Sequence, residues 1–212
     1  MLPFLCYWVH LATYWGMVVL FDFAKDGPPT LDRKDYARVA RAALWNQIFL
    51  TLPLGWLGLS ILMYPMTPSD AQQAYDLPWL AVVILLSDIY FYLTHRLLHT
   101  RWLWHLHKSH HHGELAVAKA LDAGCIEHVG CNLGAWIFPF VFLQVLTGRR
   151  PAPMLLGTWT VLATWSTCAS HAKQRGVHGD KGFHAVHHAN RNANFGVGFY
   201  AMDKFLGTFK SS

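Results

Sequence analysis

Long apolar runs separated by short polar stretches are the main pattern in this chain of 212 residues. Five runs have roughly the 17–25 residues with which an α-helix crosses the core of a bilayer. They are Leu2–Phe23, Gln47–Met66, Pro78–Thr94, Val129–Leu146 and Ala152–Ser170. Only Thr147–Pro151 separates the last two, so they are either two short spans or a hairpin that enters from one side. The pattern predicts an all-α integral membrane protein with four or five transmembrane helices.

Positive charges gather between particular runs. Of the 17 Lys and Arg residues, five lie in 24–46, four in 96–128 and six in 171–212, whereas Arg149 and Arg150 lie between the last two runs. If both of these runs cross, the first three groups share one face, which the positive-inside rule makes cytoplasmic. We therefore expect the amino terminus on the opposite side and a cytoplasmic helical cap over the membrane helices.

Composition narrows the class of protein. Hydrophobic residues make up 53% of the chain and charged residues 14%, against about 25% charged residues in soluble domains. This excludes a disordered chain and disfavours a soluble domain. The net charge of +5 would suit a nucleic-acid partner, but we expect none, because the basic residues form no patch separate from the apolar runs. Histidine is the unusual residue, since 13 of the 14 histidines follow position 94.

The first histidine pair, His95 and His99, is separated by one helical turn. Residues four apart lie on the same face of a helix, so both imidazoles can reach one metal ion. Asp88 lies seven residues before His95 on the same stripe, inside a predicted span. A carboxylate there needs a partner or a function, and orienting a ligand histidine would suit it.

Two further boxes repeat the spacing HxxHH. In a helix His107 would face both His110 and His111, so that three imidazoles converge from one turn. The second box has the same spacing and consists of His184, His187 and His188. Helical spacing argues against an adventitious histidine-rich loop. Eight positioned imidazoles exceed what one ion accepts, so two metal ions are predicted; imidazole suits zinc, copper, iron and nickel alike.

These boxes occur in a recognisable order. The chain contains Asp88-x-Tyr90-Phe91-Tyr92-x-x-His95, the two HxxHH boxes, Asn194-Phe195-Gly196 and Asp203-Lys204-x-Leu206-Gly207-Thr208. In this order and spacing, residues 80–208 resemble the fatty acid hydroxylase/sterol desaturase superfamily. The resemblance implies a membrane diiron enzyme with two Fe ions, mostly of the endoplasmic reticulum in eukaryotes. It also implies a ninth ligand, His171.

The resemblance further implies an activity and a redox partner. Such enzymes use O2 to hydroxylate or desaturate sterols, sphingoid bases or fatty acyl chains, and some relatives cleave aldehydes. Their electrons commonly come from NADPH or NADH through cytochrome b5 and its reductase. No fused cytochrome b5 domain is visible in this sequence, so we expect a separate donor. We favour hydroxylation over desaturation, and no single lipid is indicated.

Three polar residues are candidates for a catalytic role beside the metals. Glu127 occupies the place of the family's HPxE element, but Gly124-Cys125-Ile126-Glu127 lacks its histidine and proline. His128, the next residue, either compensates or is an ordinary surface histidine, and we favour the second interpretation. Glu127 or Asp88 would assist proton supply, and Asn194 would hydrogen-bond a ligand or a metal-bound water. For Asp203 we expect a structural pair with a basic residue.

A second interpretation is a non-enzymatic protein that binds or transports metal. A transporter would carry polar ligands at the midplane of the membrane, whereas the predicted ligands here lie at the surface. A degenerate enzyme would have lost ligands, and none of the nine is missing. We therefore favour the enzyme. Residues 1–77 are predicted to form the N-terminal transmembrane helices with a basic cytoplasmic loop, and 78–212 the domain with the dimetal site.

Overall fold

The fold comes from a computed structural model that describes residues 2–25, 31–63, 77–148, 150–172 and 182–211. Helices, and no strands, are found in these ranges. The membrane-embedded part consists of α1 (Leu2–Met17), η1 (Val18–Lys25), α2 (Arg33–Asn46), η2 (Gln47–Thr51), α3 (Leu52–Met63), α5 (Leu77–Leu98), η4 (His128–Leu133), α8 (Gly134–Thr147) and α9 (Pro153–Ser170). Short elements complete the chain: α6 (Trp104–His107), η3 (Val117–Leu121), α7 (Cys125–Glu127), α10 (Phe183–Ala189) and α11 (Ala201–Phe205).

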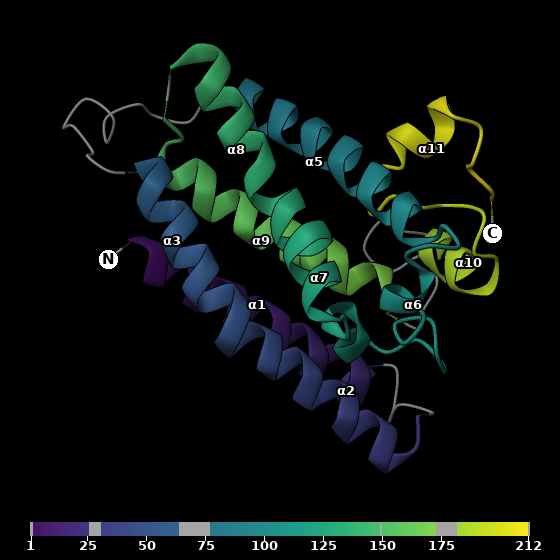
Figure 1. Ribbon diagram of the computed structural model, residues 1–212. Coiled ribbons are helices and arrows are strands. Elements are labelled where there is room, and N and C mark those ends of the chain that lie inside the picture. The colour runs from purple at the N-terminus through teal and green to yellow at the C-terminus, as the bar shows by residue number, and fades with distance from the viewer. Residues whose placement is uncertain (1, 26–30, 64–76, 149, 173–181, 212) are drawn as a thin grey trace.

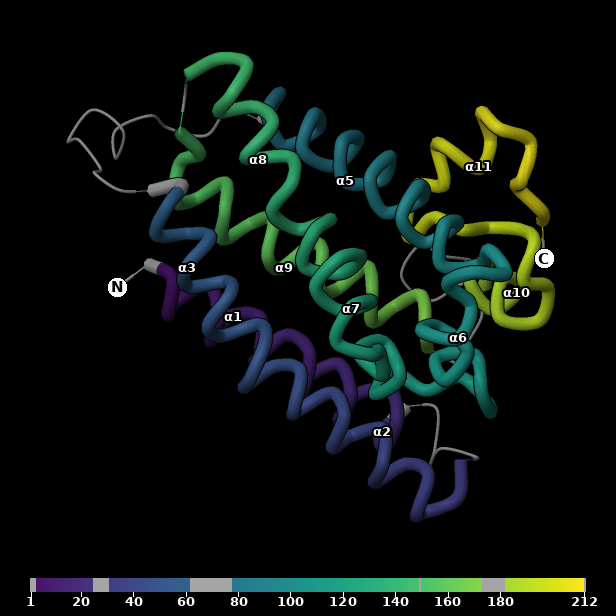
Figure 2. Tube along the Cα trace, in the orientation of Figure 1, coloured from purple at the N-terminus to yellow at the C-terminus, as the bar shows by residue number. Residues whose placement is uncertain are grey.

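Four helices are long and apolar enough to cross a membrane. They cover Pro3–Ala24, Arg33–Ile61, Pro78–Leu98 and Cys125–Thr147. The predicted all-α membrane architecture is thus confirmed. The long helices lie side by side, and the N-terminus is at the opposite end of the bundle from α6 and α10 (Figures 1 and 2).

The second span begins earlier than predicted. The basic stretch 24–46, expected to be a loop, is helical from Arg33 and continues through the π-helical segment η2 into α3. Asp32 caps this helix, because its carboxylate accepts the backbone N–H groups of Lys34 and Asp35. Alanine, arginine and lysine, which favour helices, fill the turns that follow. Residues 64–66 of the predicted span lie outside the described residues.

The run 152–170 forms a helix inside the bundle. α8 ends at Gly148, whose φ of 67° is the left-handed conformation in which glycine commonly terminates a helix. α9 then returns antiparallel to α8, between α1 and α5 (Figure 1). Buried Thr160 and Thr164 give α9 polar side chains inside the bundle. Its return places His171 at the same end of the bundle as His95.

A buried carboxylate attaches the cap to the membrane helices. Asp22 of η1 accepts the backbone N–H groups of Val117 and Ala118 at 2.7 and 3.0 Å, and the hydroxyl of Tyr36 at 3.1 Å. These bonds hold η3 against η1 and α2, where the side chains form one hydrophobic cluster with the end of α9. The segment that carries the histidines therefore packs against these helices through η3.

Candidate metal centre

All nine predicted ligand histidines gather at one end of the bundle, in two groups. The first group consists of His95, His99, His107, His111 and His187; the second consists of His110, His171, His184 and His188. Within each group, one nitrogen from every ring lies within 4.8 Å of the others. His105 and His112, which flank the first HxxHH box and belong to neither group, are exposed. His178 lies outside the described residues.

Each HxxHH box divides between the two groups. His107 and His111 join the first group, while His110 joins the second. In the other box the division is reversed, since His187 joins the first group and His184 and His188 join the second. His107 lies beside both His110 and His111 as predicted, with ring centroids 5.1 and 4.8 Å apart, but the three rings are shared between two groups. α6 ends at His107 and turns follow, so that His110 points to the other group and the boxes bridge the two.

Hydrogen bonds from outside the groups orient several rings of the first group. Nδ1 of His95 lies 2.6 Å from the carbonyl oxygen of Phe195, and Nδ1 of His187 lies 2.8 Å from that of Ala193. Nδ1 of His107 lies 2.8 Å from Oε1 of Glu127. A carbonyl or carboxylate oxygen can only accept, so each Nδ1 carries the proton and each Nε2 is left with a lone pair.

The second group is oriented by backbone carbonyls. Nδ1 of His171 lies 2.9 Å from the carbonyl oxygen of Thr167, one turn back in α9, and 3.0 Å from Oγ of Ser170. Nδ1 of His110 lies 3.3 Å from the carbonyl oxygen of Asp122. In these two rings, too, Nε2 is the atom that remains to bind a metal.

These orientations leave lone pairs facing one another. Nε2 of His95 lies 3.0 Å from Nε2 of His107, and Nε2 of His171 lies 3.1 Å from Nε2 of His110. Two acceptors at that distance repel each other unless a cation lies between them. Further ring nitrogens, Nε2 of His99, Nε2 of His187 and both nitrogens of His188, are buried without a hydrogen-bond partner. The residues therefore fit one cation in each group.

Burial keeps the imidazoles in the form that binds metal. Desolvation, reinforced at His99 and His111 by neighbouring imidazoles and Arg191, lowers the pKa of both rings to about 2. Burial lowers the pKa of His107 to about 3 and that of His171 to about 4. These rings are consequently neutral at physiological pH, as a ligand must be. The all-nitrogen donor set suits iron, zinc, copper or nickel.

Glu127 is buried beside the first group. Its Oε1 is the acceptor for His107, and its Oε2 has no hydrogen-bond partner. The side chain of Glu127 therefore positions a ligand histidine, the role that the sequence pattern suggested for Asp88. His128 is buried rather than at the surface, so our favoured interpretation of it was wrong. It packs inside the bundle, where its Nε2 lies 2.9 Å from the hydroxyl of Thr51.

Asp88 anchors the C-terminal strap, residues 190–211, to the membrane helices. Its Oδ2 accepts the backbone N–H of Met202 at 3.2 Å, and no histidine is its hydrogen-bond partner among the described residues. The ring of His95 is held instead by the carbonyl of Phe195 in the strap. The predicted contact of Asp88 with a ligand histidine is thus absent from the described residues.

Asn194 and Asp203 hold the same strap together. The side-chain amide of Asn194 donates to the carbonyls of Phe183 and Lys210, and its Oδ1 accepts the N–H of Lys210. These bonds occupy the side chain, so Asn194 has no hydrogen bond to a histidine, contrary to our expectation. Asp203 has no basic partner either, since it accepts from the N–H groups of Phe195 and Gly196 and from the hydroxyl of Thr208.

Trp104 is an aromatic residue beside the first group, and the sequence alone did not indicate that position. The ring of Trp104 lies 5.2 Å from that of His99 and 5.3 Å from that of His111, measured between centroids. The guanidinium of Arg191 lies 4.7 Å from the centroid of the same Trp104 ring. The Trp104–His107 spacing alone would not single this residue out, because the chain has ten tryptophans.

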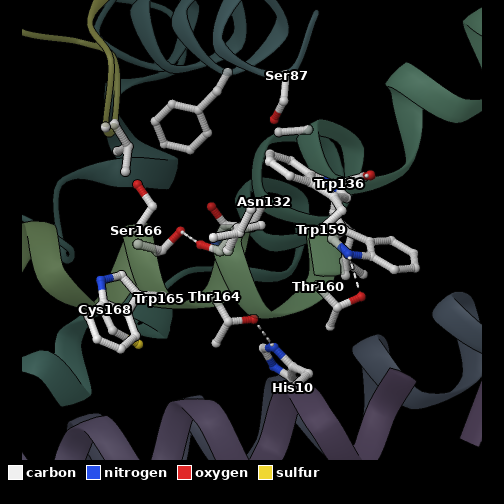
Figure 3. A pocket seen from close by; sticks show the side chains of 18 of the residues that line it. His10, Ser87, Asn132, Trp136, Trp159, Thr160, Thr164, Trp165, Ser166 and Cys168 are labelled. Carbon is white, nitrogen blue, oxygen red and sulfur yellow. Dashed lines mark hydrogen bonds between the residues drawn. The ribbon is translucent and has the colours of Figure 1, made fainter. Parts of the chain in front are cut away.

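A cavity of about 780 Å³ opens among the membrane helices (Figure 3). Its lining is mainly apolar and aromatic, and includes Trp136 and Trp159. At the histidine end it reaches Phe91, whose ring lies 5.1 Å from that of His95, and Thr167, which bonds His171. A lipid lying in this cavity would extend from the membrane interior towards the metal ligands.

Comparison with known proteins places these features in a family. The model of the fatty acid hydroxylase family matches residues 80–208, more than half of the chain. A Dictyostelium discoideum protein named as a methylsterol monooxygenase is 31% identical over 140 residues, covering 61% of this chain and 49% of the relative. A Delta(7)-sterol 5(6)-desaturase of Gibberella zeae is 25% identical over 150 residues, covering 70% of this chain and 42% of the relative.

A third relative has a different named activity. A very-long-chain aldehyde decarbonylase of Oryza sativa is 31% identical over 140 residues, covering 59% of this chain and 50% of the relative. The chain spans about half the length of the curated relatives it matches. No solved structure matches it.

Proposed function

The chain belongs to the fatty acid hydroxylase family, and on that premise we propose that it is a membrane-bound diiron oxygenase that hydroxylates or desaturates a lipid. The family and its named relatives support a lipid-modifying enzyme, and we propose the metal, the oxidant and the type of reaction together with that activity.

One observation carries the proposal. Nine histidines, buried or half-buried, form two ligand groups, and an apolar cavity between the membrane helices ends beside them. Oxidising an unactivated C–H bond requires a strong oxidant. Two iron ions supply it by activating O2, whereas zinc has no redox chemistry. A purely structural pair of metals would need neither the cavity nor its position.

The protein's own groups bind, orient and exclude water. The five and four histidines would each hold one iron ion, and Glu127 and the strap carbonyls keep three rings of the first group pointing inwards. The cavity would orient the lipid chain along α9, with Phe91 and Thr167 near the reacting end. Since the ligand rings are buried, bulk water is kept away from the site.

Electrons would come from a separate donor such as cytochrome b5 with an NAD(P)H-dependent reductase. We propose hydroxylation as the main outcome, with the lipid a sterol, a sphingoid base or a fatty acyl chain. We also propose that the histidine end faces the cytoplasm, in the endoplasmic reticulum if the protein is eukaryotic.

The test combines metal analysis with lipid mass spectrometry. Cells expressing the wild type are compared with cells expressing His187→Ala, and with His105→Ala as a matched control because His105 is exposed and outside both groups. We expect two irons per wild-type chain and a lipid heavier by one oxygen that is absent from His187→Ala. A product lighter by two hydrogens would establish desaturation instead. Undiminished product in His187→Ala, or zinc in place of iron in the active protein, would contradict the proposal.

A further inference from the structure

Hydroxyl groups on the helices around the cavity differ in how their protons are used. Those of Thr94, Thr160 and Thr167 donate to backbone carbonyls of their own helices. Thr164 makes no such bond; it lines the cavity, and its single hydrogen bond joins Oγ1 to Nδ1 of His10 at 2.9 Å (Figure 3). The direction of that bond decides what Thr164 presents to a ligand.

A relay across three helical segments fixes the direction. The indole N–H of Trp15 can only donate, and it lies 2.9 Å from Oε1 of Gln47. The Gln47 amide therefore directs its nitrogen to Nε2 of His10, 3.3 Å away, which must accept. In a neutral imidazole the other nitrogen then carries the proton, so Nδ1 of His10 donates to Thr164.

The relay ends in an unused donor. Because Oγ1 of Thr164 accepts from His10, its own proton is free, and the described residues offer it no acceptor. Gln47 lies in the π-helical segment η2, a type of irregularity that is frequent at functional sites. Thr164 lies seven residues before His171, so the donor is about two helical turns, or roughly 10 Å, inside the bundle from the histidines.

A second polar group on the lining has no partner. Asn132 of η4 lies within the span Cys125–Thr147, lines the cavity, and makes no side-chain hydrogen bond among the described residues. Unmade hydrogen bonds at this depth in a membrane are unfavourable. An amide can both donate and accept, so Asn132 complements a hydroxyl group as well as Thr164 does.

We propose that the cavity is built for a lipid alcohol, whose hydroxyl oxygen accepts the proton of Thr164 while its apolar body extends along the cavity, from Trp136 and Trp159 towards Phe91 and Thr167. This inference rests on the proposed lipid-oxidising function and adds to it a substrate class and a residue that sets specificity. A hydrocarbon chain alone would leave Thr164 and Asn132 unsatisfied. The alcohol is held well inside the bundle, so the Thr164 contact sets how far the lipid reaches towards the metals.

The test is equilibrium binding, which does not require turnover. Purified full-length protein in lipid nanodiscs is titrated with a sterol that carries one ring hydroxyl, with the matching hydrocarbon and with the matching ketone. A long-chain alcohol and its alkane form the second set. We expect the wild type to bind the alcohols about fivefold more tightly than the hydrocarbons, the effect of one net hydrogen bond, with the ketone between them.

Isosteric variants locate the effect. Thr164→Val should abolish the preference for the alcohol, and Thr164→Ser should retain it. Thr160→Val is the control for a general disturbance of the cavity wall, because Thr160 lines the same cavity one turn earlier, donates its proton to the carbonyl of Leu156 and accepts the indole N–H of Trp136. Should Thr164→Val fail to fold, Trp15→Phe leaves Thr164 in place, removes the first donor of the relay and should reduce the preference about twofold.

Equal binding of alcohol and hydrocarbon by the wild type would overturn the inference, as would a preference that survives Thr164→Val or is lost equally in Thr160→Val. These outcomes are separable from the test of the proposed function. A failed preference leaves iron-dependent lipid oxidation intact, whereas absence of iron or of oxidised product leaves the binding result standing.

Discussion

The two histidine groups use the same kind of ligand but are supported differently. In the first group, Glu127 places a carboxylate on His107, and the strap carbonyls of Phe195 and Ala193 hold His95 and His187. In the second, the backbone carbonyls of Thr167 and Asp122 hold His171 and His110. An anionic acceptor makes its imidazole more basic. The two groups should therefore differ in their affinity for a metal ion, and the mutation of a supporting residue should lower that affinity in its own group.

The groups also differ in their surroundings. Trp104 lies beside His99 and His111 of the first group, and the guanidinium of Arg191 lies over the Trp104 ring. The second group instead adjoins the end of α9 and the segment after η3, where Asp122 pairs with Arg38. The first group depends on residues distant in sequence, while the second depends largely on the ends of helices.

The largest expected effect is loss of one metal ion by a single ligand substitution. His187 and His188 are adjacent in sequence but belong to different groups. His187→Ala and His188→Ala should each reduce the metal content from two ions to one per chain, measured by elemental mass spectrometry, and each should reduce product formation to background. Exposed His112 provides the control, His112→Ala. If either variant lost both ions, the division into two groups would be refuted.

The next largest effect separates the groups by charge. Glu127→Gln keeps the shape of the side chain and removes the negative charge that the Glu127 carboxylate places beside His107. The affinity of the first group for metal should fall by about 10–100-fold, as for other carboxylate partners of ligand histidines, while the second group is unchanged. Competition with a chelator measures both affinities. Exposed Glu114→Gln is the control, and equal weakening of the two groups would count against the assignment.

A smaller effect is expected from loosening the strap. Asp203→Asn weakens the charge-assisted bonds to the N–H groups of Phe195 and Gly196. We expect a loss of about 2 kcal/mol in the free energy of unfolding and a less than tenfold loss of affinity, confined to the first group. Thermal unfolding and chelator competition measure these quantities. Lys204→Gln, next to it on the exposed face of α11, is the control. A larger effect on the second group would contradict this role.

The smallest difference between the groups should be their response to acid. Burial lowers the pKa of His107 to about 3 and that of His171 to about 4, from about 6.5 in an unfolded chain. Below about pH 6.5 the unfolded state therefore binds more protons, and the metal-free fold loses stability as the pH falls. Unfolding as a function of pH tests the sign. Both groups should release metal over the same acidic range, and well-separated midpoints would show that their environments differ more than these contacts imply.

Sequence patterns identified the ligands because metal binding depends on residue type and local spacing. All nine histidines come together, including His171, which no local spacing connects to the others. The same patterns did not predict which groups contact and orient the ligand histidines. Asn194 was expected at a ligand, and it instead bonds the backbone of Phe183 and Lys210. Backbone carbonyls such as that of Phe195 carry no signal in the sequence, because any residue could supply them.

The sequence by itself predicted the membrane helices, eight imidazoles in spaced boxes and two metal ions, since hydrophobic length, helical periodicity and ligand chemistry are properties of short segments. The family resemblance added His171. Only the tertiary structure decided how each HxxHH box is shared between two groups, why Glu127 rather than Asp88 contacts a ligand, and where Thr164 presents its proton. Those outcomes depend on hydrogen bonds between segments far apart in the chain. Such bonds exist only after α1, α5, α9 and the strap have packed together.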